Sequence, residues 1–269
     1  MKILFNKKQL SKLIHYERNL GFVPTMGFLH SGHVSLIKKS MIQCRKTIVS
    51  IYINKQQFNK KSDYLKYPKS IKKDISLLKK LKIDYLYMPK SKEIYYDGAN
   101  KNIKIDSLSK KLCGKYRPNH FNAVADVIDR FLKIIKPSKI YFGEKDMQQL
   151  LLIKNFIKKK YKNVKVISCK TIREKNGIAL SSRNFFLKKR EKYVASNIYK
   201  LIFRKKKLLI NKVFSIKKLE KKIMNMGVKK IDYLELLNIN KLIKPYKPNK
   251  RYRIFIAYYL GSTRLIDNI

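Results

Sequence analysis

Residues 20–53, LGFVPTMGFLHSGHVSLIKKSMIQCRKTIVSIYI, set the architecture of the chain. The segment LGFV is typical of a strand that ends at Pro24, and the segment from Ser31 onward has the pattern of a helix. The segment TIVSIYI at 47–53 is almost continuously apolar, which indicates a strand buried on both faces. A strand, a helix and a second strand in this order predict a right-handed βαβ unit in a parallel sheet.

The same alternation continues along the first two-thirds of the chain. Its sequence patterns predict helices over 70–82, 121–136 and 145–160, and strands over 84–88, 139–142 and 164–169. We therefore expect an α/β domain over 1–172, a Rossmann-like, doubly wound parallel sheet with helices on both faces.

The remainder of the chain has a different pattern. It predicts helices over 187–206 and 216–226, then strands over 230–239 and 251–260 joined by the turn-like KPYKPNK. Two strands joined by a turn form an antiparallel pair, so we expect a smaller C-terminal α+β domain over 173–269, which could act as a lid.

The composition narrows the class of protein. Hydrophobic residues make up 45% of the 269 residues, which is typical of a globular chain. No apolar run approaches the roughly 20 residues that cross a bilayer, and lysines interrupt the first segment, so we expect neither a membrane span nor a secretion signal. Three widely separated cysteines fit neither a zinc pattern nor a disulfide framework. We expect a cytoplasmic protein.

The charge balance is extreme, with 65 Lys and Arg residues against 17 Asp and Glu residues and a net charge of +48. Such a balance is typical of proteins that neutralise nucleic-acid phosphates. However, the lysines interrupt nearly every segment instead of forming one stripe, and the abundant Lys, Ile, Asn and Tyr all have AT-rich codons. We favour a solvated lysine coat and expect no specific nucleic-acid partner.

The segment HSGH gathers two of the chain's four histidines, His30 and His33, at the predicted start of a helix. Zinc proteases place two histidines four residues apart with a glutamate between them, so this spacing of three argues against a metal site. A glycine turn with surface histidines is the plain alternative. The start of a helix also favours phosphate, because its backbone N–H groups and macrodipole attract negative charge. Gly27 and Gly32 would let a nucleotide approach the backbone.

Two further segments carry groups that suit phosphate. FGEKDMQQL at 142–150 places Lys145 and Asp146 at another strand-to-helix turn, where the carboxylate could hold a ribose hydroxyl or hydrated Mg²⁺. LSSRN at 180–184 offers two hydroxyl groups and Arg183, although it could equally be a helix cap. Ligands of parallel sheets bind beyond the carboxyl ends of the strands, so the turns at PTMG and FGEKD should share a cleft.

These motifs resemble those of the pantothenate synthetase (pantoate–β-alanine ligase) family, within the superfamily of nucleotidylyltransferases and class I aminoacyl-tRNA synthetases. HxGH alone is common across that superfamily. The more specific motifs occur in the family's order: INKQQF (53–58), RPNHF (117–121), FGEKDMQQL, TIREKNGIALSSRN (171–184), IDYLEL (231–236) and LGSTRLIDNI (260–269).

The resemblance implies a two-step reaction. Pantoate first attacks the α-phosphate of ATP to give pantoyl adenylate and pyrophosphate, and the amine of β-alanine then displaces AMP to give pantothenate. It also implies Mg²⁺ and a homodimer. Transfer to a different, phosphate-bearing acceptor is an alternative, but it would have no need for the amide-rich segments QQF and QQL.

The resemblance assigns site residues as well. His33 would act as the acid, and phosphate would be held by His30, Lys145, Ser182 and Arg183. The ATP site would comprise Met26, Gly27, Phe28, Leu29, His30, Ser31, Gly32, His33, Gly143, Glu144, Lys145, Asp146, Ile172, Leu180, Ser181, Ser182 and Arg183. Pantoate and β-alanine would meet Asn54, Gln57, Arg117 and Gln149. Asp74 would hold Mg²⁺ or its waters, with an exposed ion pair as the alternative.

Overall fold

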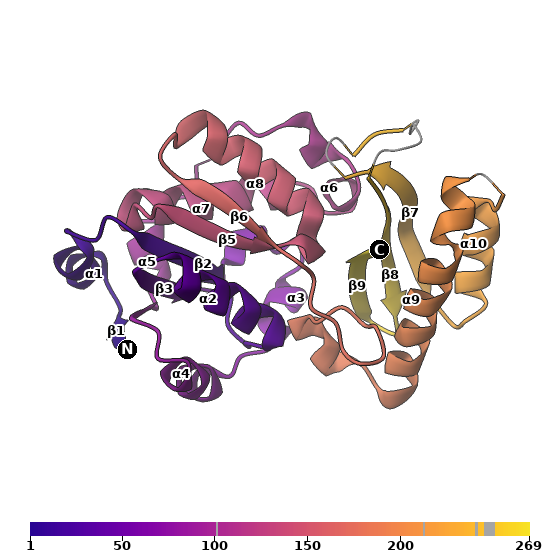
Figure 1. The fold of residues 1–269 in the computed structure, drawn as a ribbon, viewed down its shortest axis with the longest axis horizontal. Helices are drawn as coiled ribbons and strands as arrows, with labels where there is room; N and C mark the ends of the chain where they lie inside the picture. The colour runs from indigo at the N-terminus through magenta and orange to yellow at the C-terminus, as the bar shows by residue number, and fades with distance from the viewer. Residues whose placement is uncertain (101, 212, 240–241, 245–250) are drawn as a thin grey trace. The chain divides into compact units, whose positions relative to one another are not determined.

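The computed structural model describes residues 1–100, 102–211, 213–239, 242–244 and 251–269. These residues form two compact units. The first unit comprises Met1–Glu144 and Gln149–Lys170, and the second comprises Lys145–Gln148 and Thr171–Ile269. Each unit has its own sheet (Figure 1). Among these residues no helix combines the length and the apolar character needed to cross a bilayer.

The sheet of the first unit is entirely parallel in its described residues. Its strands are β1 (Lys2–Leu4), β2 (Leu20–Thr25), β3 (Lys46–Ile51), β4 (Tyr85–Tyr87), β5 (Lys139–Gly143) and β6 (Lys165–Cys169). Their order across the sheet is β1-β4-β3-β2-β5-β6. The predicted Rossmann-like sheet is confirmed.

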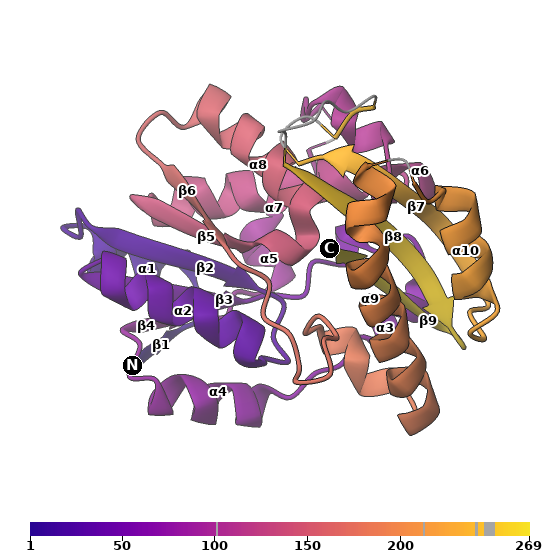
Figure 2. The ribbon, with the colours of Figure 1, turned by 45° about the vertical axis from the view of Figure 1, so that its right-hand side comes forward.

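Helices connect these strands. They are α1 (Lys7–Ile14), α2 (Ser31–Gln43), α3 (Lys61–Lys66), α4 (Ile71–Lys80), α5 (Ser91–Ile94), α6 (Cys113–Tyr116), α7 (His120–Ile135) and α8 (Met147–Lys160), with 3-10 turns η1 (Lys55–Gln57), η2 (Ser107–Lys110) and η3 (Glu144–Asp146). Figures 1 and 2 show α2 and α4 on one side of the sheet and α7 and α8 on the other.

The alternation of side chains along β2 explains both layers, since neighbouring residues of a strand point to opposite faces. Val23 lies in a buried cluster with Ile37 of α2 and Leu78 of α4. Phe22 points the other way, and its ring lies 5.4 Å from that of Phe131 in α7. β2 is therefore buried on both faces, and the burial of β3 agrees with the same prediction made for residues 47–53.

The chain reverses direction across the sheet between β2 and β5, which are hydrogen-bonded neighbours. From β2 it crosses to β3 on one side, and from β5 it crosses to β6 on the other side. Because such crossovers are right-handed, α2 and α8 must lie on opposite faces, and the carboxyl ends of β2 and β5 mark the switch point at which sheets of this kind bind ligands. The sheet order therefore brings together the strand ends that precede HSGH and EKD.

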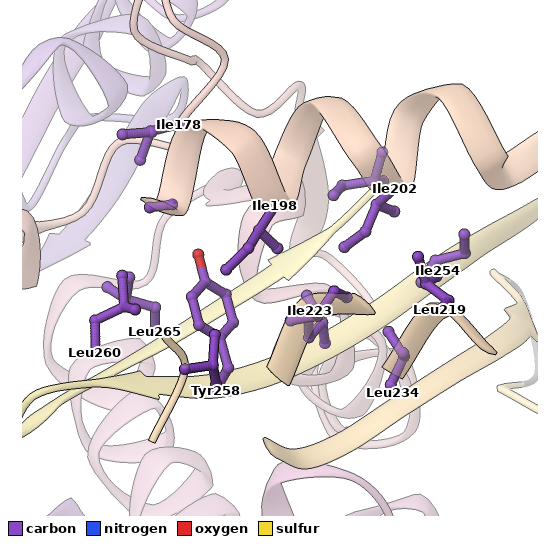
Figure 3. Close-up of a cluster of buried hydrophobic side chains, with 14 of the residues drawn as sticks. Ile178, Ile198, Ile202, Leu219, Ile223, Leu234, Ile254, Tyr258, Leu260 and Leu265 are labelled. Carbon is purple, nitrogen blue, oxygen red and sulfur yellow. The ribbon is translucent and has the colours of Figure 1, made fainter. Parts of the chain in front are cut away.

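The second unit packs two helices on an antiparallel sheet. Its elements are η4 (Ser182–Phe186), α9 (Lys189–Ile210), α10 (Ile216–Met224), β7 (Lys230–Asn238), β8 (Tyr252–Leu260) and β9 (Thr263–Asn268). In the described residues β8 is the central strand of three. Figure 3 shows its buried core, which includes Ile198, Ile202, Leu219, Ile223, Ile254 and Tyr258. The predicted α+β architecture is confirmed.

The sequence-based prediction lacked β1, α1 and β9, and also the short helices α3, α5 and α6. Lysines interrupt the first two, and β9 follows β8 after a short turn with Arg264, Asp267 and Asn268 among its positions. These polar side chains hide the apolar alternation by which a strand is recognised. Most of the predicted turn KPYKPNK, residues 245–250, lies outside the described residues.

Candidate active site

The loop after β2 turns sharply at Gly27, whose φ is +78°. A side chain there would be strained, and a Cβ would lie 3.0 Å from Asp74 Oδ2. Thr25 stabilises the start of the loop, because its hydroxyl donates to the carbonyl of Ser50 (2.7 Å) and accepts from the backbone N–H of Gly27 (3.1 Å). Glycine at this position is thus required by the shape of the loop.

Asp74, from the first turn of α4, holds the next two residues of this loop. The backbone N–H of Phe28 donates to Oδ2 (2.7 Å) and that of Leu29 donates to Oδ1 (2.8 Å). Phe28 has a φ of +51°, a left-handed conformation that is uncommon for a bulky residue and that the two hydrogen bonds help to maintain. Burial raises the pKa of Asp74, although both hydrogen bonds act in the opposite direction.

These contacts give Asp74 a role in addition to the expected one. The residue is only 3% exposed, so the alternative of an exposed ion pair is wrong. Both carboxylate oxygens already accept backbone hydrogen bonds, and the described residues contain no group of three or more His, Cys, Asp or Glu side chains that could hold a metal ion. Asp74 therefore supports the loop, and its assignment to Mg²⁺ or its waters stays a prediction.

The rings of His30 and His33 lie against each other at the start of α2, with centroids 4.1 Å apart and planes tilted by 35°. His30 is the N-cap, and its Nδ1 accepts from the backbone N–H of Gly32 at 3.1 Å. Nδ1 of His33 accepts in turn from the backbone N–H of His30 at 3.3 Å. In each neutral ring the proton therefore resides on Nε2, which becomes the donor. Two backbone N–H groups at the start of α2 thus donate to imidazole nitrogens.

The strand β5 ends at Gly143, and a single 3-10 turn, η3, leads from it into α8. In this turn, Nζ of Lys145 lies 3.7 Å from Oδ1 of Asp146. The Lys145 side chain is 17% exposed and that of Asp146 is 47% exposed. The carbonyl of Lys145 accepts a hydrogen bond from the side chain of Asn268, at 2.8 Å. Gln149 lies in the first turn of α8.

The segment TIREKNGIALSSRN folds into a hairpin-like loop. Leu180 donates its N–H to the carbonyl of Ile172 (3.0 Å), so two residues assigned to the ATP site become neighbours. The hydroxyl of Ser181 accepts from the backbone N–H of Arg183 (3.3 Å) and caps η4. Ser181 therefore caps a 3-10 turn, whereas the N-cap of the helix α9 is Lys188. Ser182 is 7% exposed.

The turn η1 places Gln57 beside the loop after β2. Its amide donates from Nε2 to the sulfur of Met26 at 3.0 Å, which joins a predicted pantoate residue to a predicted ATP residue. The backbone carbonyl of Gln57 accepts from Nη2 of Arg117 (3.1 Å) and lies 2.8 Å from Nδ1 of His120. Arg117 therefore orders the position of Gln57.

Asn54 lies beneath Gln57 and is only 1% exposed. Its Nδ2 reaches Oε1 of Gln57 (3.4 Å) and the carbonyl of Ala123 (3.2 Å), while its Oδ1 accepts from the hydroxyl of Tyr95 (2.9 Å). These partners favour a supporting position over direct contact with a substrate carboxylate. Burial raises the pKa of Tyr95, so its hydroxyl stays protonated and donates.

Sequence reasoning missed the supporting residues Tyr95 and His120 and the hydrogen bonds of Asp74 to the loop after β2. A signal existed for Asp74, since it lies between Ile71 and Leu78 on the apolar side of the predicted helix, where a lone carboxylate needs buried partners. For the other two residues the partners lie 41 and 63 positions away along the chain. No local pattern could have revealed them.

The doubly wound sheet, the sharp glycine loop after β2 and the histidine pair at the start of α2 define a class. They are the features of Rossmann-like proteins that bind a nucleotide at the carboxyl ends of their strands. Within this class, residues 2–269 match the model of the pantoate–β-alanine ligase family, and the chain belongs to that family of ligases.

Similar proteins span the full length of the chain. The pantothenate synthetase of Sulfurihydrogenibium sp. (strain YO3AOP1) is 38% identical, with 100% of this chain and 99% of that protein covered. The crystal structure of the pantothenate synthetase from Thermus thermophilus is 30% identical with a TM-score of 0.91, covering 100% of this chain and 99% of that one. The Francisella tularensis ligase, complexed with beta-gamma ATP and β-alanine, is 38% identical with a TM-score of 0.86, covering 100% and 97%.

Proposed function

We propose that the chain condenses (R)-pantoate with β-alanine at the expense of ATP, giving pantothenate, AMP and pyrophosphate. The observation that carries the proposal is the match of residues 2–269 to the ligase family. The histidine pair and the glycine loop support it, because they provide the donors and the space that a nucleotide phosphate needs.

The reaction would proceed in two displacements. A carboxylate oxygen of pantoate attacks the α-phosphorus of ATP, a new P–O bond forms, and the bond to the pyrophosphate breaks. The amine of β-alanine then attacks the acyl carbon of pantoyl adenylate, a C–N bond forms, AMP leaves, and the amine loses a proton. The first displacement moves negative charge onto pyrophosphate, so it depends most on donors and cations.

For this first displacement we assign the two histidines as donors. The hydrogen bonds to both Nδ1 atoms support a proton on Nε2, so each ring can donate to a phosphate oxygen without a change of tautomer. In this assignment His33 stabilises the departing pyrophosphate and His30 contacts phosphate. Lys145, Ser182 and Arg183 add further donors, and Asp146 holds the ribose.

Around these residues we propose that the ATP site includes Met26, Gly27, Phe28, Leu29, Ser31, Gly32, Gly143, Glu144, Ile172, Leu180 and Ser181. Backbone groups would make many of the contacts to ATP, since several of these residues are glycines or have apolar side chains. The glycine at 27 supports the proposal because its φ of +78° keeps the loop close to the strand ends.

For pantoate we propose Gln57 and Gln149 as the direct contacts. Amide side chains can bind both hydroxyl and carboxylate groups without adding charge. The hydrogen bond from Gln57 to Met26 supports a site next to the ATP loop. Asn54 and Arg117 would act indirectly, by holding Gln57 in position.

We propose that Mg²⁺ enters with the phosphates of ATP, as part of the substrate, and that Asp74 would hold the ion or its waters. A homodimer, a cytoplasmic location and a lid role for the C-terminal domain beyond residue 172 complete the proposal. Light scattering at several protein concentrations tests the dimer.

The decisive experiment supplies ATP, Mg²⁺, pantoate and β-alanine and measures AMP, pyrophosphate and pantothenate. We expect the three products in equal amounts, and no AMP release when pantoate is omitted. Without β-alanine, pyrophosphate release should stop after about one equivalent per active site. Pyrophosphate release that needs no pantoate and is driven by a phosphate-bearing acceptor would instead support the alternative of nucleotidyl transfer.

A further inference from the structure

The last strand of the second unit reaches back to the turn that carries Lys145. Asn268, near the end of β9, donates from Nδ2 to the carbonyl oxygen of Lys145 at 2.8 Å. The Asn268 residue is 4% exposed, so this hydrogen bond is shielded from water. The two residues are 123 positions apart in the chain. The contact fixes the main chain of Lys145 without using its ammonium group.

The orientation of the Asn268 amide is determined by its other partner. Nη1 of Arg253 donates to Oδ1 of Asn268 at 2.7 Å. A guanidinium can only donate and a carbonyl can only accept, so the amide has one orientation that satisfies both neighbours. Arg253 therefore orients the Asn268 amide so that its Nδ2 donates to the Lys145 carbonyl.

The end of β9 is itself held firmly. Arg173 pairs with both oxygens of Asp267, at 2.6 and 2.9 Å, and also donates to the carbonyl of Asn268 at 3.3 Å. Its guanidinium lies over the ring of Tyr199, 4.5 Å from the centroid. Ile254 and Ile269 exchange backbone hydrogen bonds of 2.9 and 3.0 Å beside this cluster. The strand thus provides a rigid support.

We propose that Asn268 is a positioning residue for Lys145 in adenylate formation. Lysine has a flexible side chain with four carbon atoms, so the place of its ammonium depends on how well its backbone is fixed. By holding the Lys145 carbonyl, Asn268 limits the movement of the turn between β5 and α8. This inference rests on the proposed contact of Lys145 with phosphate.

The test uses Asn268→Ala and Asn268→Asp in the full chain. The aspartate keeps an acceptor for Arg253 but turns an oxygen toward the Lys145 carbonyl, so it should be at least as harmful as alanine. For both variants we expect kcat/KM for ATP in pyrophosphate release to fall about 10- to 100-fold, the scale expected for a misplacement of about 1 Å. Conversion of preformed pantoyl adenylate with β-alanine should change less than about twofold, because Lys145 then has no pyrophosphate to stabilise.

A stability control separates positioning from simple loss of fold. Leu265→Ala removes a core side chain from the same strand, and Leu265 packs in the cluster with Ile254 and Tyr258. We expect this variant to lower Tm as much as Asn268→Ala or more, while kcat/KM measured well below Tm stays near that of the wild type. An equal loss of activity in Leu265→Ala would overturn the proposal.

A double-mutant cycle decides whether Asn268 acts through Lys145. Lys145→Ala alone should lower adenylate formation strongly, and adding Asn268→Ala should then have almost no further effect. Additive losses would overturn the proposal, because Asn268 would then act elsewhere. If Lys145→Ala retains full activity, the assigned role of Lys145 is wrong and the inference falls with it, whereas product formation would still support the proposed reaction.

Discussion

The loop after β2 and the turn η1 are both supports for predicted site residues, but they are held in opposite ways. In the loop, one side chain, that of Asp74, accepts two backbone N–H groups. At η1, one backbone carbonyl, that of Gln57, meets two side chains, Arg117 and His120. Phe28 and Leu29 are thus held by one side chain, whereas the position of Gln57 is held by two.

This difference predicts how each region responds to substitution. Loss of Asp74 should release both Phe28 and Leu29 and so affect the chemistry at the histidines that follow. Loss of one support at η1 should leave the others in place and produce a small, graded effect on pantoate binding. The two regions also affect different kinetic parameters, since one is assigned to phosphate transfer and the other to substrate binding.

The largest effect is expected for His33→Ala, which removes a hydrogen-bond donor at the start of α2, directly after the loop that follows β2. Adenylate formation should fall by about 10² to 10³, as for the loss of one preorganised donor to a developing negative charge. Pyrophosphate release in rapid-quench experiments measures this step. Preformed pantoyl adenylate should largely bypass the defect.

A matched control for this substitution is His15→Ala, since His15 is exposed at the end of α1 and its ring lies against that of the neighbouring Tyr16. We expect nearly unchanged activity. Equal damage by His33→Ala to both half-reactions would show that the imidazole supports the fold or general binding and not the departure of pyrophosphate.

Asp74→Ala comes second and tests whether a single residue holds the loop. Two partly buried N–H groups would lose their acceptor, at about 1–3 kcal/mol each, so we expect the free energy of unfolding in urea to fall by about 2–4 kcal/mol relative to the wild type. Asp74→Asn keeps one acceptor oxygen, so its free energy of unfolding should lie between those of the wild type and Asp74→Ala. A loss below about 0.5 kcal/mol in both variants would mean that the loop does not depend on Asp74.

The pH dependence of the free energy of unfolding, compared between the wild type and Asp74→Asn, supplies a second measurement. Because burial raises the pKa of Asp74, the folded chain binds its proton more tightly than the unfolded chain does. This difference in proton binding adds to the free energy of unfolding at acid pH, below the ordinary pKa of an aspartate. The added stability is lost as the pH rises through the raised pKa of Asp74 in the folded chain. The stability difference between the wild type and Asp74→Asn should therefore decrease as the pH rises, and an increase would contradict burial as the main cause.

Much of the β2 region could be predicted from the sequence because its determinants are local. Gly27 is required by a positive φ, His30 and His33 lie within one turn of a helix, and the buried strands on either side are continuous apolar runs. Each of these properties depends on neighbours within a few residues. The parallel sheet follows from the same alternation of strands and helices.

The supports of η1 could not be predicted in this way. Tyr95 and His120 meet Asn54 and Gln57 only after the chain has folded, and neither carries a local signal of its partner. The same holds for the contact between Asn268 and Lys145. The motif containing Asn268 resembled the family's tail, yet the resemblance alone did not indicate what the residue touches. Tertiary hydrogen bonds are selected by geometry that a sequence pattern does not contain.

The smallest effect is expected for Tyr95→Phe, which removes one hydroxyl from the shared support of Gln57. The carboxamide oxygen of Asn54 then loses a donor at 2.9 Å, while its amide still reaches Ala123 and Gln57. A single neutral hydrogen bond contributes about 0.5–1.5 kcal/mol, so KM for pantoate should rise about two- to tenfold with kcat for adenylate formation nearly unchanged. Tyr85→Phe is the matched control, because the Tyr85 hydroxyl donates instead to Glu17, at 3.4 Å. If Tyr95→Phe lowered adenylate formation as strongly as His33→Ala, support at η1 would not be shared, and the contrast between the two regions would be lost.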